Sequence, residues 1–368
     1  MLVTQQGKPY SVFTPFMRNA MTHEVPTPKR NARANYYHNI LITPCSSLRE
    51  ADPREATKHH KGHSHFSNSL QLQEKLVQSR ILSRPSYALD CRVAPLRSAP
   101  RRDGGGGRKA GLAILEKTGF INTYKHARDL PALPGTSHLS PHHKFGTISI
   151  RETYEIARTH HGEGAQQFIA ELYWRDFYYH IAYHFPHVFG KSFLPWGDCI
   201  TWRNDPTALT AWQRGETGIP IVDAGMRELN ETGWMHNRVR MVVASFLTKN
   251  LLIDWREGEK YFAQKLVDYD PAVNNGGWQW SASVGADPRP LRIFNPYTQA
   301  QKYDPRAEYI TQWVPELQKV PAHLLTDGKE HDLSTLAPTY PGPIVSCRES
   351  YHRAREAYAK ARRDYARA

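Results

Sequence analysis

Apolar residues recur at helical spacing along most of the chain after about residue 110. The runs cover 111–127, 165–185, 235–255 and 258–270. A further run, 219–233, has Pro220 near its start and Gly233 at its end, as helices often do. The alternation of apolar and polar positions that is typical of half-buried strands is almost absent. The pattern predicts a mainly α-helical domain over residues 111–340 and a charged helical tail over 341–368.

The first third of the chain has a different character. Its apolar periodicity is weak, and it contains basic clusters, the histidine tract "HHKGHSH" at 59–65 and "GGGG" at 104–107. We expect residues 1–110 to be largely irregular or disordered, above all 20–108. These residues carry a net charge of +11, out of +13 for the whole chain, so the remainder carries only +2. A polyanion site after residue 110 must therefore be a local arrangement of charge.

Composition excludes several classes of protein. The mean hydropathy is −0.63, and no apolar run approaches the ~20 residues of a membrane span. The first twenty residues do not have the pattern of a secretory signal. The four cysteines are far apart and form no C-x-x-C pair, so we expect reduced thiols in an intracellular protein and no structural metal. The histidine tract is too dense for a folded metal site and is interpreted as a solvated loop.

Four side chains of the run 165–185 share one helical face: Glu171, Trp174, Arg175 and Tyr178. They could form the polar and aromatic wall of a pocket, or only a Glu–Arg surface pair beside two half-buried rings. A second face, in "GWMHNRVRMVVAS", carries Asn237, Arg240, Met241 and Ala244, with Arg238 on its flank. Small residues at 244 and 245 would let a flat ligand approach, but an ordinary helix with two solvated arginines has the same pattern.

Two further segments combine turn-forming residues with candidate chemistry. In "VDYDPAVNNGGWQWSAS", Asp270 before Pro271 is a good N-cap, which leaves Asp268 unexplained. The tetrapeptide 274–277 consists of turn formers and runs directly into Trp278 and Trp280. "GTSHLSPHHKFG", 135–146, is a Thr/Ser turn before a helical segment, which could hold a diphosphate or only cap a helix. It is not a nucleotide-triphosphate loop, and no motif for nucleophilic or zinc catalysis stands out.

These segments, in this order, resemble the photolyase/cryptochrome superfamily. The resemblance rests on "RDLPALPGTSHLSP", "FIAELYWRDFYYHI", the long stretch from "WQRGETG" to "GEKYF", "DYDPAVNNGGWQWSASVGAD" and "RIFNPYTQAQKYDPRAEYI". It covers about 120–320, the helical FAD-binding domain of that superfamily. Residues 7–21 resemble the segment that links this domain to an N-terminal α/β antenna domain, so we expect the antenna domain to be lacking. Glu171 and Met241, with Asn237 where (6-4) photolyases carry a histidine-rich version, make it most similar to class I cyclobutane pyrimidine dimer photolyases.

The resemblance implies roles for individual residues. Asn274 would face N5 of the flavin, the two glycines after it would leave room for the ring, and Arg240 would pair with Asp268. Asp270 would accept a hydrogen bond from the flavin ring or its ribityl chain. The residues implied to contact FAD are Tyr124, Thr136, Ser137, His138, Leu139, Ser140, Phe168, Glu171, Arg175, Trp234, Asn237, Arg240, Asp268, Asp270 and Asn274.

Further roles concern DNA and electron supply. The residues implied to contact damaged DNA are Glu171, Trp174, Arg238, Met241 and Trp280, with a flipped dimer between the two tryptophans. Those implied to act in catalysis are Glu171, Asn237 and Met241, together with an electron-hopping chain of Trp278, Trp255 and Trp202.

The implied function is light-driven repair of cyclobutane pyrimidine dimers by electron transfer from reduced FAD to a flipped-out dimer. We expect a monomer that binds double-stranded DNA and neither a membrane nor a metal. We expect it in the cytoplasm of a bacterium, or in the nucleus and also the mitochondrion of a eukaryote. Two alternatives stay open: a cryptochrome-type blue-light photoreceptor, and an inactive truncated photolyase fragment.

Overall fold

The computed structural model describes residues 2–28, 106–286 and 291–368. Within these residues the chain is helical, and its only β feature is an isolated bridge between Val3 and Pro9. The prediction of a mainly α fold is confirmed. The expected disorder of 20–108 and the histidine tract at 59–65 fall almost entirely outside the described residues.

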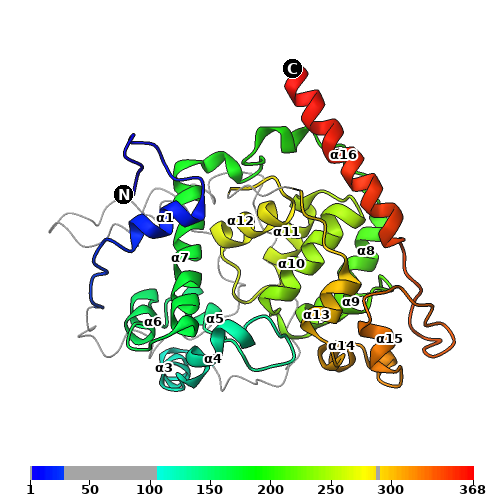
Figure 1. The fold of residues 1–368 in the computed structure, drawn as a ribbon, viewed down its shortest axis with the longest axis horizontal. Helices are drawn as coiled ribbons and strands as arrows, with labels where there is room; N and C mark the ends of the chain where they lie inside the picture. The colour runs from blue at the N-terminus through cyan, green and yellow to red at the C-terminus, as the bar shows by residue number, and fades with distance from the viewer. Residues whose placement is uncertain (1, 29–105, 287–290) are drawn as a thin grey trace, which may run out of the picture.

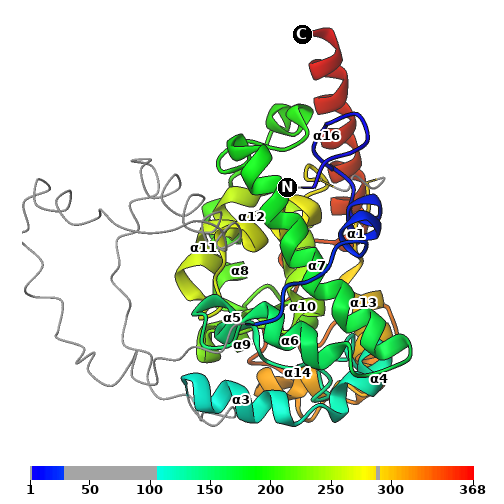
Figure 2. The same ribbon diagram turned by 90° about the vertical axis from the view of Figure 1, so that its left-hand side faces the viewer.

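Figures 1 and 2 show the described part of the chain as a succession of helices. The N-terminal group is α1 (Phe13–Ala20), α3 (Arg108–Glu116), α4 (Gly119–Ala127), α5 (Ser140–Lys144), α6 (Ile150–Ala157), α7 (Glu163–His184), η2 (Pro186–Val188) and η3 (Pro195–Cys199). The middle group is α8 (Pro206–Arg214), α9 (Pro220–Thr232), α10 (Asn237–Ser245), η4 (Phe246–Asn250), α11 (Trp255–Lys265) and α12 (Pro271–Ser281). The last group is α13 (Pro296–Tyr303), α14 (Glu308–Trp313), η5 (Pro315–Leu317), α15 (Ala322–Thr326) and α16 (Cys347–Arg367).

The predicted helical runs are present, but two of them are interrupted. The run 111–127 is split between α3 and α4 at Lys117 and Thr118. The run 235–255 forms α10, then a π-helical turn over Phe246–Asn250, and then breaks where Leu252 adopts a positive φ of 54°. By contrast, α9 ends at Gly233 with φ 71°, as the sequence indicated, because glycine adopts the left-handed conformation without a steric penalty.

The turn formers at 274–277 lie inside a helix. Asp270 caps α12 by accepting hydrogen bonds from the main-chain N–H groups of Ala272 and Val273, each at 3.1 Å, and Pro271 occupies the first helical position. The Asn275 amide then donates to the Val188 carbonyl at 3.0 Å. Tertiary contacts of this kind outweigh the low helix propensity of Asn and Gly.

The central helix α12 contacts α7, α10 and α11 and brings their side chains together. In Figure 1 the long α7 stands on one side of α12, and α10 and α11 lie on the other. The main hydrophobic core includes Trp212, Trp255 and Trp278 and extends to Tyr358 of α16, so the C-terminal helix packs into the core. Phe13 and Phe16 of α1 pack against Phe177 of α7 in a second cluster.

Candidate flavin and DNA site

An ionic network joins three segments beside the polar face of α7. Arg128, directly after α4, donates to Oε1 of Glu171, and the Gln167 amide donates to the same oxygen at 2.8 Å. Arg238 of α10 donates to Asp129 at 2.7 Å, and Asp129 lies 3.8 Å from the Arg128 guanidinium. Two arginines and two carboxylates thus neutralise one another.

The partner of Glu171 differs from the one that the spacing on α7 suggested. Arg175, four residues along, lies 4.5 Å from the centre of the Tyr179 ring and 3.6 Å from Asp176. The interpretation of Glu171 and Arg175 as a surface pair is therefore wrong. Sequence reasoning missed Arg128 and Asp129, although they begin the quoted motif "RDLPALPGTSHLSP".

The expected pair of Arg240 and Asp268 is confirmed. The guanidinium donates to Oδ2 of Asp268 at 2.9 Å and to the Met235 carbonyl at 2.7 Å. Asp268 is buried, and its other oxygen, Oδ1, has no partner among the described residues. A buried acceptor without a partner destabilises a protein unless a ligand or water supplies a donor. Since Arg238 is paired as well, the interpretation of two solvated arginines on this helix is wrong.

Asn274 is held in one orientation by Glu259 of α11. Its amide nitrogen donates to the Glu259 carbonyl at 3.2 Å and to the Glu259 carboxylate at 3.0 Å. Burial raises the pKa of Glu259, and the hydrogen bonds from Asn274 and Tyr269 oppose that shift. The amide nitrogen is thus committed within the protein, and no described residue donates to the Asn274 carbonyl oxygen. That oxygen is an acceptor suited to a ring N–H.

The two glycines of α12 have different surroundings. A Cβ added at Gly277 would meet nothing within 4 Å. A Cβ added at Gly276 would lie 2.1 Å from the Tyr178 ring of α7. The expectation that both glycines leave room for a flavin is therefore wrong for Gly276, which is required by the close approach of α7.

The Thr/Ser turn precedes a helical segment, as predicted. Ser137 Oγ accepts from the Leu139 N–H at 3.3 Å, His138 has a positive φ of 52°, and Ser140 begins α5. The His138 ring lies 4.3 Å from the Trp234 ring, so the turn meets the segment before α10. Thr136 is half-buried and Leu139 is buried. The structure thus brings together two segments that are about 100 residues apart.

Three further residues expected to contact the cofactor are Tyr124, Phe168 and Asp270. Tyr124 and Phe168 are both buried and meet edge to face at 5.1 Å. Burial raises the pKa of Tyr124, with the Glu171 charge as the next cause. Both Asp270 oxygens have partners, because Oδ2 accepts from the Tyr179 hydroxyl at 2.5 Å while Oδ1 caps α12. The N-cap interpretation of Asp270 is confirmed, and its flavin contact stays a prediction.

The three tryptophans of the expected electron chain lie at different depths. Trp278 and Trp255 are buried, and Trp202 is half-buried 6.3 Å from the Tyr358 ring. Trp278 packs closely enough on Gly258 that a Cβ there would lie 2.1 Å from its ring. Sequence reasoning missed Trp212, which is fully buried and meets Trp278 edge to face at 6.0 Å.

The residues expected at the DNA lesion differ in burial and in the contacts they make within the protein. Trp174 stacks on Phe13 with ring centres 3.6 Å apart, so one of its faces is already covered. Asn237 is exposed at the start of α10, Met241 is half-buried one turn further on, and Trp280 is half-buried. Ser245 accepts a hydrogen bond from the Phe294 N–H at 3.3 Å, and Ala244 and Ser245 are both buried. The close approach of a flat ligand to them is therefore not supported.

The acceptors at Asn274 and Asp268 and the open space at Gly277 suit a flat ligand that carries N–H donors. The described part of the chain is helical, and acceptors of this kind suit the ring of a flavin. The family described as "FAD binding domain of DNA photolyase" matches residues 168–360. The chain belongs to this family, whose cofactor is FAD.

Individual relatives of the chain are named deoxyribodipyrimidine photo-lyases. The chain is 50% identical over 246 residues to a deoxyribodipyrimidine photo-lyase of Halobacterium salinarum, covering 64% of this chain and 51% of the relative. It is 40% identical to one from Synechococcus, covering 94% of this chain and 66% of the relative. A crystal structure of a class III photolyase from Agrobacterium tumefaciens has a TM-score of 0.73 at 36% identity, over 98% of this chain and 70% of that one. The chain spans about half to two thirds of the length of these curated relatives.

The residues of the centre fit a flavin. Asn274 would hold the ring by its carbonyl oxygen, Asp268 offers a second acceptor, and Gly277 leaves space beside the helix. No helix in the described ranges is long and apolar enough to cross a membrane. In those same ranges no three His, Cys, Asp or Glu side chains are grouped to hold a metal ion.

Proposed function

We propose that this chain repairs cyclobutane pyrimidine dimers in double-stranded DNA under blue light, and that it acts as a monomer where the cell keeps its DNA. The observation that carries the proposal is the arrangement of Glu171. Two donors, from Arg128 and Gln167, hold Oε1, while no described residue binds Oε2. A half-buried carboxylate with one oxygen anchored and the other available can bind a polar group of a pyrimidine.

When bound, reduced FAD would supply the light-driven electron for repair, and the chain's own part is placement. The Asn274 oxygen accepts from a ring N–H, because Glu259 keeps the amide nitrogen turned away. Asp268, oriented by Arg240, offers its unpaired oxygen to another N–H of the cofactor. The Thr136–Ser140 turn carries the diphosphate on hydroxyls and main-chain N–H groups. Fixed acceptors of this kind need no reorganisation when charge moves.

On the lesion side, Glu171 accepts a hydrogen bond from a thymine N–H through Oε2. Trp280 supplies a stacking surface, and Trp174 contributes a second ring, one face of which Phe13 covers. Met241 and Asn237, one turn apart on α10, complete this wall. Arg128 and Arg238 are each already paired with a carboxylate. They bind DNA phosphates by exchanging those carboxylates for phosphates, and the site has no bulk positive charge.

The buried tryptophans supply electrons to the cofactor from the surface. Trp278 and Trp255 are shielded from water, and Trp202 is partly accessible to solvent. An electron could therefore enter at Trp202 and reach the buried rings. Indole rings can lose an electron without breaking a bond, and a buried ring is protected from side reactions.

The test compares Glu171→Ala and Glu171→Gln with Glu163→Ala as a matched control on the same helix. Glu163 is exposed and pairs with Lys125 on the surface, so its loss changes little. Each protein, loaded with reduced FAD, is mixed with a duplex carrying one thymine dimer, examined by gel shift, and then illuminated while restored sites are counted.

We expect the wild type and Glu163→Ala to prefer and repair the damaged duplex. Glu171→Ala should repair fewer dimers per photon at unchanged flavin content, and Glu171→Gln should retain part of the activity. If the flavin-loaded wild type neither prefers the damaged duplex nor restores it, the proposal fails and the photoreceptor or inactive-fragment alternative takes its place.

A further inference from the structure

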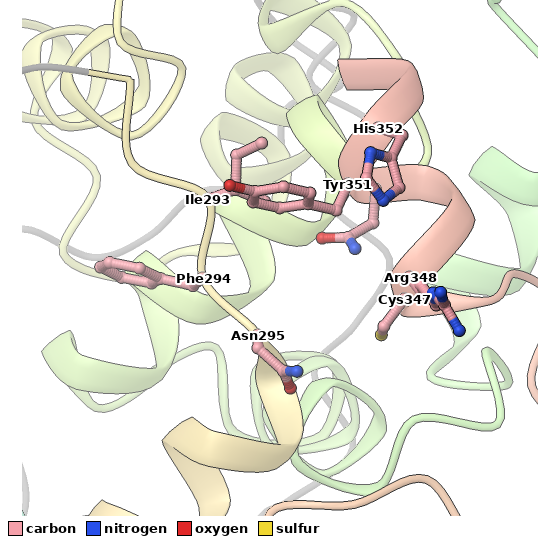
Figure 3. A pocket seen from close by; sticks show the side chains of 8 residues that line it. Ile293, Phe294, Asn295, Cys347, Arg348, Tyr351 and His352 are labelled. Carbon is pink, nitrogen blue, oxygen red and sulfur yellow. The ribbon is translucent and has the colours of Figure 1, made fainter. Parts of the chain in front are cut away.

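A cavity of about 380 Å³, lined by none of the residues assigned to the flavin centre, lies where α16 begins beside the segment that leads into α13. Figure 3 shows Ile293, Phe294 and Asn295 on that segment and Cys347, Arg348, Tyr351 and His352 on the first turns of α16. The volume lies within the range of small-molecule sites. Asn250, the last residue of the π-helical turn η4, also lines the cavity, and such turns occur often at functional sites.

Asn250 presents a buried acceptor that lacks a partner. The Ser350 hydroxyl donates to the Cys347 carbonyl at 3.1 Å, so its oxygen must accept from the Asn250 amide nitrogen, 2.9 Å away. The amide orientation is thereby fixed, and Oδ1 becomes the remaining polar atom. Asn250 is only 1% exposed, and Oδ1 has no hydrogen bond from any described residue. A ligand here must bring an N–H or O–H donor.

The surroundings of the cavity favour an anion. Arg348 and His352 line it. Arg353 donates to the main-chain carbonyl oxygen of Asn250 at 2.5 Å. Burial, and then the charge of the nearby Arg292, lower the pKa of the neighbouring Lys249 to about 7, so Arg292 rather than Lys249 adds to the positive charge here. The carboxylates that face this region are Glu330 near Cys347 and Glu349 near Arg353, so cationic groups outnumber them. Ser346 already accepts from the Glu349 N–H at the start of the 21-residue helix α16, and the N–H groups of Cys347 and Arg348 add further donors.

The apolar walls favour a flat ring. Ile293, Phe294 and Tyr351 contribute one aliphatic and two aromatic side chains, and Tyr351 is 40% exposed at the rim. Aromatic side chains stack on heterocyclic bases whatever their sequence. Burial raises the pKa of Cys347 to about 12, so its thiol stays protonated and contributes packing rather than covalent chemistry.

We propose that this cavity binds a free mononucleotide whose base carries an exocyclic amino group, an adenine nucleotide being the simplest case. The base lies between Phe294 and Tyr351 and donates to Asn250 Oδ1. The phosphate lies at the start of α16 with Arg348 and His352. The site is separate from the flavin centre and independent of the repair function proposed above.

The experiment is calorimetric titration of AMP into the full chain saturated with FAD, so that the cofactor's own adenosine site is occupied. Two comparison ligands are adenosine, which lacks the phosphate, and the N6-dimethylated analogue of AMP, which lacks the amino N–H donors. The variants are Arg348→Ala and Tyr351→Ala, both exposed at the cavity, with Arg363→Ala as a matched control further along α16. Flavin absorbance checks that the variants fold and keep the cofactor.

We expect AMP to bind the wild type and Arg363→Ala equally. AMP should bind Arg348→Ala about tenfold or more weakly than it binds the wild type. Adenosine and the dimethylated analogue should bind the wild type more weakly than AMP by a similar factor. Each of these changes removes a hydrogen bond that is charged or buried. Tyr351→Ala should weaken AMP and adenosine alike. Absence of AMP binding to the wild type at about 1 mM, or equal binding to the wild type and Arg348→Ala, overturns the proposal. Binding that requires a single-stranded oligodeoxyadenylate in place of AMP overturns it as well.

Discussion

The neighbouring glycines of α12 give a matched pair of substitutions with opposite expected effects. At Gly276 an added Cβ would lie 2.1, 2.5 and 2.8 Å from three atoms of the Tyr178 ring. That ring is itself 5.8 Å from Trp174 and 5.9 Å from Phe177, so it has little room to turn. Overpacking of this kind lowers the free energy of unfolding by about 1–3 kcal/mol, and we expect that loss in Gly276→Ala.

Gly277→Ala should have the opposite effect on the protein without flavin. A Cβ there meets nothing within 4 Å, and alanine in a helix interior is more favourable than glycine by about 0.5–1 kcal/mol. The flavin-free variant should therefore unfold at a temperature higher by roughly 1–4 °C. If the open space belongs to the cofactor, the same methyl group intrudes on it, so flavin content should fall although stability has risen.

The assay is urea and thermal unfolding of both variants with and without FAD, together with the flavin content of each purified chain. If flavin-free Gly277→Ala is less stable than the wild type, then the space beside Gly277 is not open. Unchanged flavin content in Gly277→Ala would show that the cofactor lies elsewhere, and a Gly276→Ala variant as stable as the wild type would refute the packing of α7 on α12.

Other predictions concern electron supply, DNA binding and pH. Trp278→Phe should block photoreduction of oxidised FAD by external donors, because phenylalanine is harder to oxidise, while chemically reduced Trp278→Phe should still repair; unchanged photoreduction contradicts the tryptophan route. Trp280→Ala should weaken gel-shift binding to damaged DNA by about 1–3 kcal/mol with flavin content unchanged. Burial lowers the pKa of His236 to about 4 in the folded chain, whereas this side chain has a pKa of about 6.5 in the unfolded chain. The contribution of neutral His236 to stability is therefore complete above about pH 6.5 and is lost as the pH falls towards 4. His236→Asn keeps an N-cap acceptor for Arg238 and should flatten the dependence of the urea midpoint on pH between 7.5 and 4; an unchanged slope would contradict this assignment.

Helix content and the ends of some helices could be predicted from the sequence because they depend on local signals. Pro220, Gly233 and Asp270 act within one turn of their own position. The helical state of 274–277 could not be predicted, since it depends on Tyr178, Val188 and Glu259, which are distant in sequence. Local propensity favoured a turn there, and the tertiary contacts outweigh it.

The candidate site shows the same division. The resemblance correctly implied the pairing of Arg240 with Asp268, because the motifs that carry these residues were both recognised. The partner of Glu171 was missed, since the spacing on one helix favoured Arg175 and the actual partner, Arg128, follows another helix. The stacking of Phe13 on Trp174 also joins segments about 160 residues apart, and no pattern in either segment indicates it.

Every assignment at the flavin centre depends on the binding of FAD, and one measurement tests it directly. The purified chain is incubated with FAD, freed of excess cofactor and heat-denatured, and the released flavin is counted per chain. The account predicts one FAD per chain, released without covalent attachment, from a protein with a structured flavin absorption band. A folded chain that is colourless and takes up no flavin contradicts it.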